Sequence, residues 1–208
     1  MKILYIEAKH KDQPSSSISI AGLPKDVKEL FLAYSIQYKQ EAQIIKAKLE
    51  SNGVKVIGFQ QVLGCTKLKT SFPLLLIGSG KFHALNLALQ NRVVYIYNNS
   101  CITQVDQKEL ENLKQTRKNA INRFFVSNKI GILVSTKPGQ ENIKRAESLK
   151  TKIQLKFPEK QAYILISSHI NTSEFENFDL DIFINTACPG LINDNSKIIN
   201  IDDILPFL

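Results

Sequence analysis

The chain has few cysteines, and none of them are closely spaced. Its three cysteines, Cys65, Cys101 and Cys188, are an odd number of widely separated thiols, which argues against a disulfide framework. No Cys-x-x-Cys pair occurs, so a zinc knuckle or a compact iron–sulfur motif within one segment is excluded. By spacing alone these are three free thiols, and Cys65 and Cys188, each taken singly, are most simply small core residues.

Long apolar runs are also absent, and the opening residues lead us to expect no signal peptide. No segment approaches the roughly 20 apolar residues that a membrane-spanning helix needs. The opening residues, MKILYIEA, contain one lysine and run straight into strand-like alternation, so we interpret 2–8 as the first strand. We therefore expect a cytoplasmic protein that does not bind a membrane.

Arginine is scarce among the basic residues. Only 4 of 27 are arginine, and the 19 acidic residues leave a net charge of +8. Specific nucleic-acid sites favour Arg side chains interleaved with aromatics or glycine, and this pattern is missing. We therefore expect no direct nucleic-acid binding. The scattered lysines favour solvated helix faces, with attraction to an acidic partner as the alternative.

Apolar periodicity switches repeatedly between the strand and helix periods. After 2–8, it predicts strands at 30–35, 54–59, 73–79, 93–98, 129–135, 161–167, 180–186 and 197–201. It predicts helices at 38–51, 82–90, 107–127 and 140–157. Short buried strands separated by helices indicate α/β units built around parallel sheets.

The sequence contains a weak internal repeat. YSIQYKQEAQIIKAKL, from Tyr34, aligns with VSTKPGQENIKRAESL, from Val134, at an offset of 100 residues. Each copy reads as a strand, a turn and a helix start. A repeat of this length implies duplicated domains. We therefore predict two similar three-layer α/β units with mostly parallel sheets, over 1–104 and 105–208, with the boundary in the polar stretch 99–107.

Four segments end a predicted strand in residues that could carry chemistry, at the edge where α/β sheets gather ligands. QVLGC and NTACPG each bring a cysteine to such an edge. IGSGKFH and STKPGQ place small and basic residues before a helix, where backbone N–H groups suit a carboxylate or phosphate. Simpler readings stay open, because the glycines can serve turns and His83 can cap or pack.

The motifs QVLGC, LLIGSGKFHALNLAL, GILVSTKPGQ and IFINTACPG, together with SIQY, occur in an order that resembles diphthamide synthase. This family is the 2-(3-amino-3-carboxypropyl)histidine synthase of archaea and eukaryotes. The resemblance extends from Lys2 to about Leu205, and the pair STKPGQ and TACP is specific. It identifies 1–104 as a middle-type and 105–208 as a last-type domain, with no counterpart of the family's first domain.

The resemblance implies a [4Fe–4S] cluster held by one cysteine from each of three domains, with S-adenosylmethionine as the substrate. It implies radical transfer of a 3-amino-3-carboxypropyl group to a histidine of translation elongation factor 2. Cys65 and Cys188 match the metal ligands of the middle and last domains, and Cys101 has no matching role. Gly190 stands where the family usually has arginine. The residues expected to contact the cofactor are Ser135, Lys137, Gln140, Gly78, Ser79 and His83.

Two functional hypotheses fit this pattern. In the first, a separate first-domain chain or another synthase subunit supplies the third cysteine and completes a split transferase. In the second, the chain is a non-catalytic accessory or binding subunit of the synthase complex. Both imply an exposed apolar interface and hence an oligomer.

Overall fold

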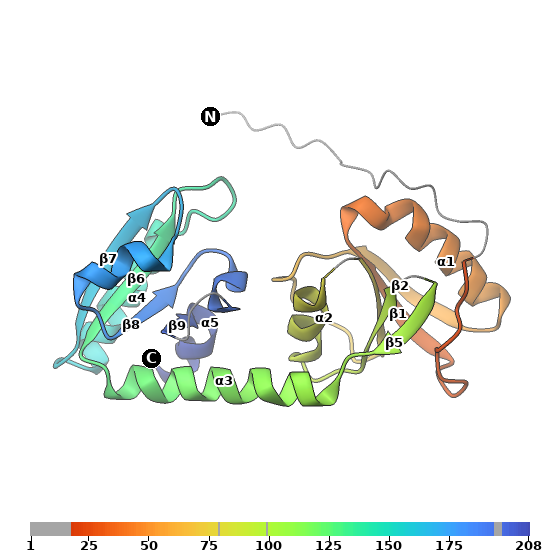
Figure 1. Cartoon of the computed structure of the whole chain (residues 1–208), viewed down its shortest axis with the longest axis horizontal. Helices are drawn as coiled ribbons and strands as arrows, with labels where there is room; N and C mark the ends of the chain where they lie inside the picture. The colour runs from red at the N-terminus through yellow and green to blue at the C-terminus, as the bar shows by residue number, and fades with distance from the viewer. Residues whose placement is uncertain (1–17, 79, 99, 194–196) are drawn as a thin grey trace. The chain divides into compact units, whose positions relative to one another are not determined.

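The computed structural model describes residues 18–78, 80–98, 100–193 and 197–208 (Figure 1). The strand predicted at 2–8 and the candidate Ser79 lie outside the described residues. The chain separates into two compact units, residues 1–110 and 111–208, and each is considered by itself. Within the described ranges, no helix is long and apolar enough to cross a membrane.

The first unit contains a five-stranded sheet in the order β2-β1-β3-β4-β5. Strands β1 to β4 pair in parallel, and β5 pairs antiparallel to β4. Strand β5 was not predicted, because Ile102 is its one buried residue and it has no apolar alternation. The strands are β1 (Glu29–Tyr34), β2 (Lys55–Gln61), β3 (Leu74–Ile77), β4 (Val94–Asn98) and β5 (Cys101–Gln104).

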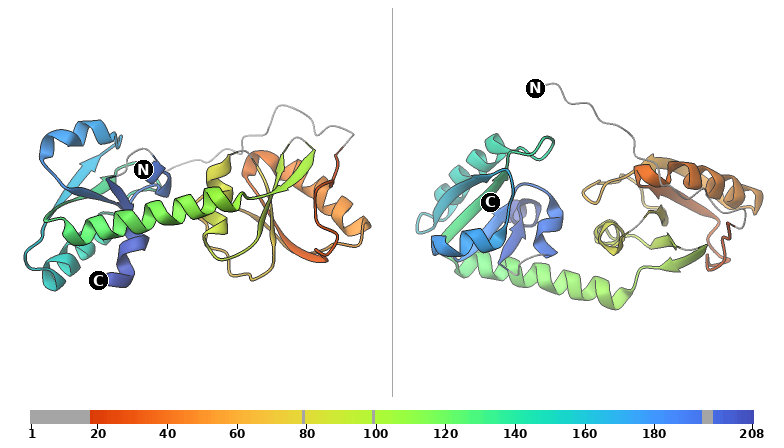
Figure 2. Two further views of the ribbon diagram at one scale, coloured as in Figure 1. Left: turned by 60° about the horizontal axis from the view of Figure 1, so that its bottom comes forward. Right: turned by 45° about the horizontal axis from the view of Figure 1, so that its top comes forward.

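Helices cover both faces of this sheet, as predicted for a three-layer unit. The short 3-10 helix η1 (Ile36–Tyr38) leads into α1 (Lys39–Ser51), which buries Ala42, Ile45 and Leu49 against one face. Helix α2 (Lys81–Ala88) covers the opposite face. In Figure 2 the orange helix α1 runs along its side of the sheet. Because both faces are covered, all four residues of β3 are buried and its sequence, LLLI, does not alternate.

The second unit contains a four-stranded, fully parallel sheet in the order β7-β6-β8-β9. Helix α3 (Gln107–Val126), the long green helix of Figure 1, begins in the first unit and packs in the second through Ala120 and Phe124. Helices α4 (Ile143–Lys156) and α5 (Ile201–Ile204) share that face. The strands are β6 (Lys129–Ser135), β7 (Gln161–Ser167), β8 (Ile182–Asn185) and β9 (Ile198–Asn200).

The opposite face of this sheet is covered by 3-10 helices instead of α-helices. Phe175 of η2 (Thr172–Phe178) and Leu191 of η3 (Pro189–Asn193) pack there against Leu133 and Phe183. The chain ends in η4 (Leu205–Phe207). The prediction of three layers therefore holds, although one layer of this unit is made of short turns of helix.

The two sheets share one topology over four strands, β2-β1-β3-β4 in the first unit and β7-β6-β8-β9 in the second. Their central strands begin at Glu29 and Lys129, which reproduces the offset of the internal repeat. The prediction of two similar, mostly parallel α/β units is therefore confirmed. Their assignment to middle-type and last-type domains, with a boundary at 104/105, stays a prediction.

Candidate functional site

Cys65 lies in a tight turn just beyond the C-terminal end of β2. Val62 N–H donates to the Tyr34 carbonyl (2.8 Å), which extends the pairing of β2 with β1. Leu63 N–H then donates to Thr66 Oγ1 (2.8 Å), and Thr66 N–H donates back to the Leu63 carbonyl (3.0 Å). The Cys65 side chain is exposed, so this thiol is displayed at the sheet edge and is not a core residue.

Two side chains that follow α2 anchor the chain after this turn. Gln90 Nε2 donates to the Thr66 carbonyl (2.9 Å), and its Oε1 accepts Leu68 N–H (3.1 Å). Arg92 Nη2 donates to the Leu68 carbonyl (2.9 Å), and burial lowers the pKa of Arg92 below its ordinary value. Sequence reasoning missed both residues, because polar side chains after a helix give no signal of so distant a contact.

The start of α2 packs against the Cys65 turn. A Cβ atom on Gly64 would lie 2.6 Å from Phe82 Cε1 and 3.4 Å from His83 Cδ2, so glycine allows this close approach. Phe82 and His83 also meet edge to face, with ring centroids 5.8 Å apart. His83 therefore lies beside the residue that precedes Cys65, and a packing role is supported. Its contact with a cofactor stays a prediction.

The ends of β1 and β3 meet at Ser35 and Gly78. Ser35 N–H donates to the Ile77 carbonyl (3.0 Å), and a Cβ on Gly78 would lie 2.6 Å from Ser35 Oγ. This Oγ is buried and has no hydrogen-bond partner in the part of the chain that the structure describes. A buried hydroxyl without a partner is uncommon in folded proteins, and the missing side chain of Gly78 is what allows this close approach. In the sequence, the one pattern that pointed to Ser35 was its alignment with Ser135 in the internal repeat.

In the second unit, the loop after β6 is held by Ser135. This buried side chain accepts Lys137 N–H at its Oγ (3.1 Å). Gln140 N–H donates to the Lys137 carbonyl (3.0 Å), and Gly139 has φ 78° after Pro138, the pattern of a type II turn. The Lys137 side chain is exposed. Lys137 precedes α4 in the chain, and the N-terminus of that helix favours an anion through its dipole.

Asn142 connects this loop to the end of β8. Its Nδ2 donates to the Thr186 carbonyl (2.9 Å), and Thr186 Oγ1 donates to the Leu133 carbonyl of β6 (2.8 Å). Because β6 and β8 are neighbouring parallel strands, their C-terminal ends meet at one edge. The structure therefore brings STKPGQ and NTACPG together within the second unit.

Two buried asparagines hold the Cys188 loop. Asn185 Nδ2 donates to the Cys188 carbonyl (2.7 Å), while its Oδ1 accepts Ala187 N–H (2.9 Å). Asn200 Nδ2 donates to the Pro189 carbonyl (3.2 Å). The Cys188 side chain is exposed. This thiol is therefore presented from a hydrogen-bonded loop, and the two asparagines that fix the loop were missed from the sequence.

Each unit displays one of the two candidate thiols at the C-terminal edge of its sheet. Cys101 is exposed as well, but it lies on β5, paired with Asn98 and outside both loops. Among the described residues, no group of three or more His, Cys, Asp or Glu side chains is placed to hold a metal ion. The metal-ligand roles of Cys65 and Cys188 stay predictions.

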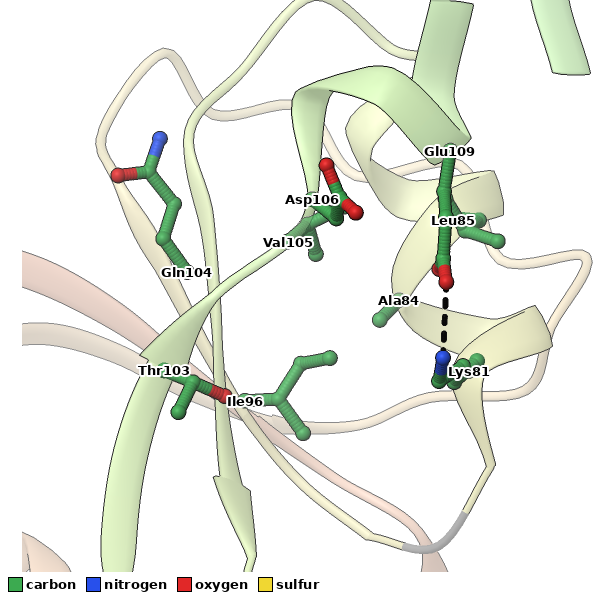
Figure 3. A pocket seen from close by; sticks show the side chains of 9 residues that line it. All are labelled: Lys81, Ala84, Leu85, Ile96, Thr103, Gln104, Val105, Asp106 and Glu109. Atoms are coloured by element: carbon green, nitrogen blue, oxygen red, sulfur yellow. Dashed lines mark hydrogen bonds and ion pairs between the residues drawn. The ribbon is translucent and has the colours of Figure 1, made fainter. Parts of the chain in front are cut away.

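A cavity of about 230 Å³ borders another face of α2 (Figure 3). Lys81 Nζ forms an ion pair with Glu109 Oε1 across it (2.8 Å), and this hydrogen bond raises the pKa of Lys81. Phe82 and His83, not Lys81, approach the Cys65 turn, so the cavity adds no side chain to that turn. Its lining residues are Lys81, Ala84, Leu85, Ile96, Thr103, Gln104, Val105, Asp106 and Glu109.

Comparison with known proteins decides the family. The model of a family described as putative diphthamide synthesis protein matches residues 1–198, nearly the whole chain. The chain belongs to the diphthamide synthesis protein family. The resemblance inferred from the sequence motifs is thereby confirmed.

Relatives within the diphthamide synthesis family are distant and longer. The 2-(3-amino-3-carboxypropyl)histidine synthase of Pyrococcus horikoshii is 26% identical over 183 residues, which are 82% of this chain and 53% of the relative. Subunit 1 of the synthase from Kluyveromyces lactis is 28% identical over 149 residues, 66% of this chain and 34% of the relative. The chain thus spans about half the length of the first relative and about a third of the second.

Solved structures show the same fold. The crystal structure of Dph2 from Pyrococcus horikoshii superposes with a TM-score of 0.75 at 24% identity, covering 85% of this chain and 56% of that protein. A structure of the same protein with a 4Fe–4S cluster gives a TM-score of 0.74 at 24% identity. The α/β fold with two mostly parallel sheets is therefore that of Dph2.

Proposed function

We propose that this chain is a component of diphthamide biosynthesis that supplies two of the cysteines of a [4Fe–4S] cluster, Cys65 and Cys188. The reaction is transfer of a 3-amino-3-carboxypropyl group from S-adenosylmethionine to a histidine of translation elongation factor 2. The observation that carries the proposal is that both thiols are exposed at strand ends, in a family whose Dph2 member has been crystallised with such a cluster. A partner polypeptide supplies the third ligand.

The residues around the two thiols fit this chemistry. Thiolates are the usual protein ligands of iron–sulfur clusters, and exposure leaves both sulfurs accessible to iron. The Cys188 carbonyl accepts a hydrogen bond from Asn185, which holds the loop in place. This bond leaves the Cys188 sulfur available to iron. When bound, the cluster would supply the electron that cleaves the Cγ–S bond of S-adenosylmethionine.

The polar groups at the strand ends suit the amino acid part of S-adenosylmethionine. The exposed Lys137 carries a positive charge in the loop that leads to α4, and both this charge and the helix N-terminus favour a carboxylate. Ser35 has an unpartnered oxygen among the described residues, and the missing side chain of Gly78 lets this oxygen lie close to the end of β3. The proposed contact residues are Ser135, Lys137, Gln140, Gly78, Ser79 and His83.

Anaerobic reconstitution with iron and sulfide tests the ligand assignment. The chain is purified from its native cells together with whatever polypeptide binds it. We expect bound iron and the visible absorption of an iron–sulfur cluster, and loss of both in Cys65→Ser and Cys188→Ser. Cys101→Ser is the matched control, since its thiol is also exposed, and it should retain the iron. Full iron content in the Cys65→Ser/Cys188→Ser double variant would contradict the proposal.

The second candidate is a non-catalytic subunit of the synthase complex. Gly190 favours it, because the family resemblance leads us to expect arginine after Cys188-Pro189. This alternative predicts that modification of elongation factor 2, followed by mass spectrometry, survives Cys65→Ser and Cys188→Ser. The split enzyme predicts that each substitution abolishes it.

A further inference from the structure

Asn142 occupies the N-cap position of α4, but its side chain does not cap that helix. Asparagine is among the residues preferred at an N-cap, because its side-chain oxygen accepts a free N–H group of the first turn. In the part of the chain that the structure describes, the Asn142 side chain makes no such hydrogen bond. Its backbone, with φ −135° and ψ 44°, also departs from the extended conformation that is usual at this position. The side chain therefore serves something other than α4.

The side-chain nitrogen of Asn142 reaches the carbonyls of two different loops. Nδ2 donates to the Thr186 carbonyl (2.9 Å) and, over a longer distance, to the Gln140 carbonyl (3.4 Å). Gln140 ends the segment STKPGQ, and Thr186 belongs to NTACPG. A side-chain amide carries two N–H groups, so one nitrogen can bind a carbonyl of each loop. Asn142 thus links the loop after β6 directly to the loop after β8.

Thr186 is a rigid point for this link, because its other polar groups are bound to the sheet. Its N–H (3.1 Å) and its Oγ1 (2.8 Å) both donate to the Leu133 carbonyl of β6. The residue is only 2% exposed. With the bond from Asn142, the N–H, hydroxyl and carbonyl groups of Thr186 all have partners, and the residue lies two positions before Cys188. The link therefore acts close to the thiol.

Asn200 shows the same behaviour at α5. It is the N-cap residue of that helix and has the extended backbone usual there, with φ −76° and ψ 143°, but among the described residues it too makes no side-chain cap. Its amide instead donates to the Pro189 carbonyl (3.2 Å). Two N-cap asparagines thus bind carbonyls of the Cys188 loop instead of capping their own helices. Positions where a local rule is broken without a local gain tend to mark functional sites.

We propose that Asn142 is a positioning residue for the metal centre, which leaves α4 without a side-chain cap and holds the STKPGQ loop and the Cys188 loop at a fixed separation. The inference rests on the proposed function, because that function makes Cys188 a metal ligand and Ser135, Lys137 and Gln140 contacts of the cofactor. A metal ligand and the groups that orient a substrate must keep their separation, since a displacement of about 1 Å lowers a reaction rate strongly. The link through Asn142 supplies this constraint within the second unit.

Asn142→Asp separates this role from simple stabilisation. Aspartate has nearly the same shape and is an equally good N-cap residue, and its charge suits the helix N-terminus. Its carboxylate has no N–H group, so it cannot bind the Thr186 carbonyl. We expect it to cap α4 and offset the stability lost at Thr186, so that its midpoint of thermal unfolding stays near the native value. Asn142→Ala loses the link without gaining a cap, and its midpoint should fall.

Amide hydrogen exchange of the full chain, without iron, measures the link itself. The Ala187 N–H donates to Asn185 Oδ1 (2.9 Å) and reports on the Cys188 loop. We expect it to exchange about tenfold faster in both Asn142→Asp and Asn142→Ala, the effect of losing one hydrogen bond. Asn122→Asp, at an exposed position of α3, is the matched control and should exchange at the native rate. Native exchange in Asn142→Asp, with faster exchange in Asn142→Ala alone, would show that the loop follows overall stability and would overturn the proposal.

Release of iron to a chelator measures the consequence for the metal centre. After anaerobic reconstitution of the chain with its partner polypeptide, we expect release to be about tenfold faster in Asn142→Asp than in the native and Asn122→Asp complexes. A native rate of release in Asn142→Asp would overturn the positioning role, whatever the exchange result. A failure of the proposed function gives a different pattern, in which Cys188→Ser retains as much iron as the native complex, and that result would overturn this inference as well.

Discussion

The buried side chains of Asn185 and Asn200 are hydrogen-bonded to each other, with 2.8 Å between Asn185 Nδ2 and Asn200 Oδ1. These residues lie opposite each other at the ends of the parallel strands β8 and β9. Each also donates to a carbonyl of the Cys188 loop, Asn185 to Cys188 and Asn200 to Pro189. The position of the Cys188 thiol is thus tied to the sheet through this pair.

Asn200→Ala should destabilise the second unit and loosen the Cys188 loop. It leaves the Pro189 carbonyl without this donor and removes one acceptor of Asn185, so the free energy of unfolding should fall by about 1–3 kcal/mol. Urea unfolding measures this change. Asn122→Ala, at an exposed position of α3, is the matched control and should change the free energy little. Equal free energies of unfolding for Asn200→Ala and Asn122→Ala would argue against a role of Asn200 in holding the loop.

Gly78→Ala should destabilise the first unit through Ser35. The new Cβ would lie 2.6 Å from Ser35 Oγ, and such overpacking costs about 1–3 kcal/mol. Ser35→Ala alone should cost little, because the hydroxyl has no partner among the described residues. The Gly78→Ala/Ser35→Ala double variant should recover most of the loss, which a double-mutant cycle of thermal unfolding would measure. Simple additivity would show that the two side chains do not interact.

Lys160→Met should also lower stability. The buried Lys160 ammonium donates to the Phe125 carbonyl (2.9 Å) and to the Ser127 carbonyl, and it lies 5.5 Å from the centroid of the Phe124 ring. Methionine fills a similar volume but leaves both carbonyls without this donor, at a cost of about 1–3 kcal/mol. Lys156→Met, at the exposed end of α4, is the control. A Lys160→Met chain as stable as the control would show that water replaces the ammonium group.

Asp181 should make the second unit sensitive to acid. Its Oδ2 accepts the N–H groups of Asn128 and Lys129 (both 2.8 Å), and these bonds lower its pKa below 3.8. Because the folded pKa is below the unfolded one, the stabilisation is complete above pH 3.8 and is lost as pH falls through the folded pKa. Asp181→Asn should therefore be less stable than the native chain near neutral pH, with the gap closing in acid.

Guanidinium unfolding at a series of pH values measures that gap. Asp26→Asn, at an exposed position of the first unit, is the matched control and should leave the free energy of unfolding unchanged. A gap between native and Asp181→Asn chains that stays constant down to the most acidic sample would contradict the assignment of the effect to the Asp181 carboxylate.

Strong periodicity made most of the fold predictable. The apolar run of β3 and the apolar stripe of α1 mark residues that are buried in the structure. Both elements lie close to their predicted ranges. Strand β5 was missed because it buries one residue and exists through its pairing with β4. Helix α4 begins at Ile143 and not at 140, because the Lys137–Gln140 turn occupies the start of that range.

The sequence alone determined the family, the duplicated α/β units and the two cysteine segments, since motifs and apolar periods are local properties of the chain. Only the tertiary structure decided that both thiols are exposed, that Asn185 and Asn200 hold the Cys188 loop, and that Ser35 meets Gly78. These relationships join residues that are distant in the chain. They depend on how neighbouring strands end at one sheet edge, and no local pattern encodes that geometry.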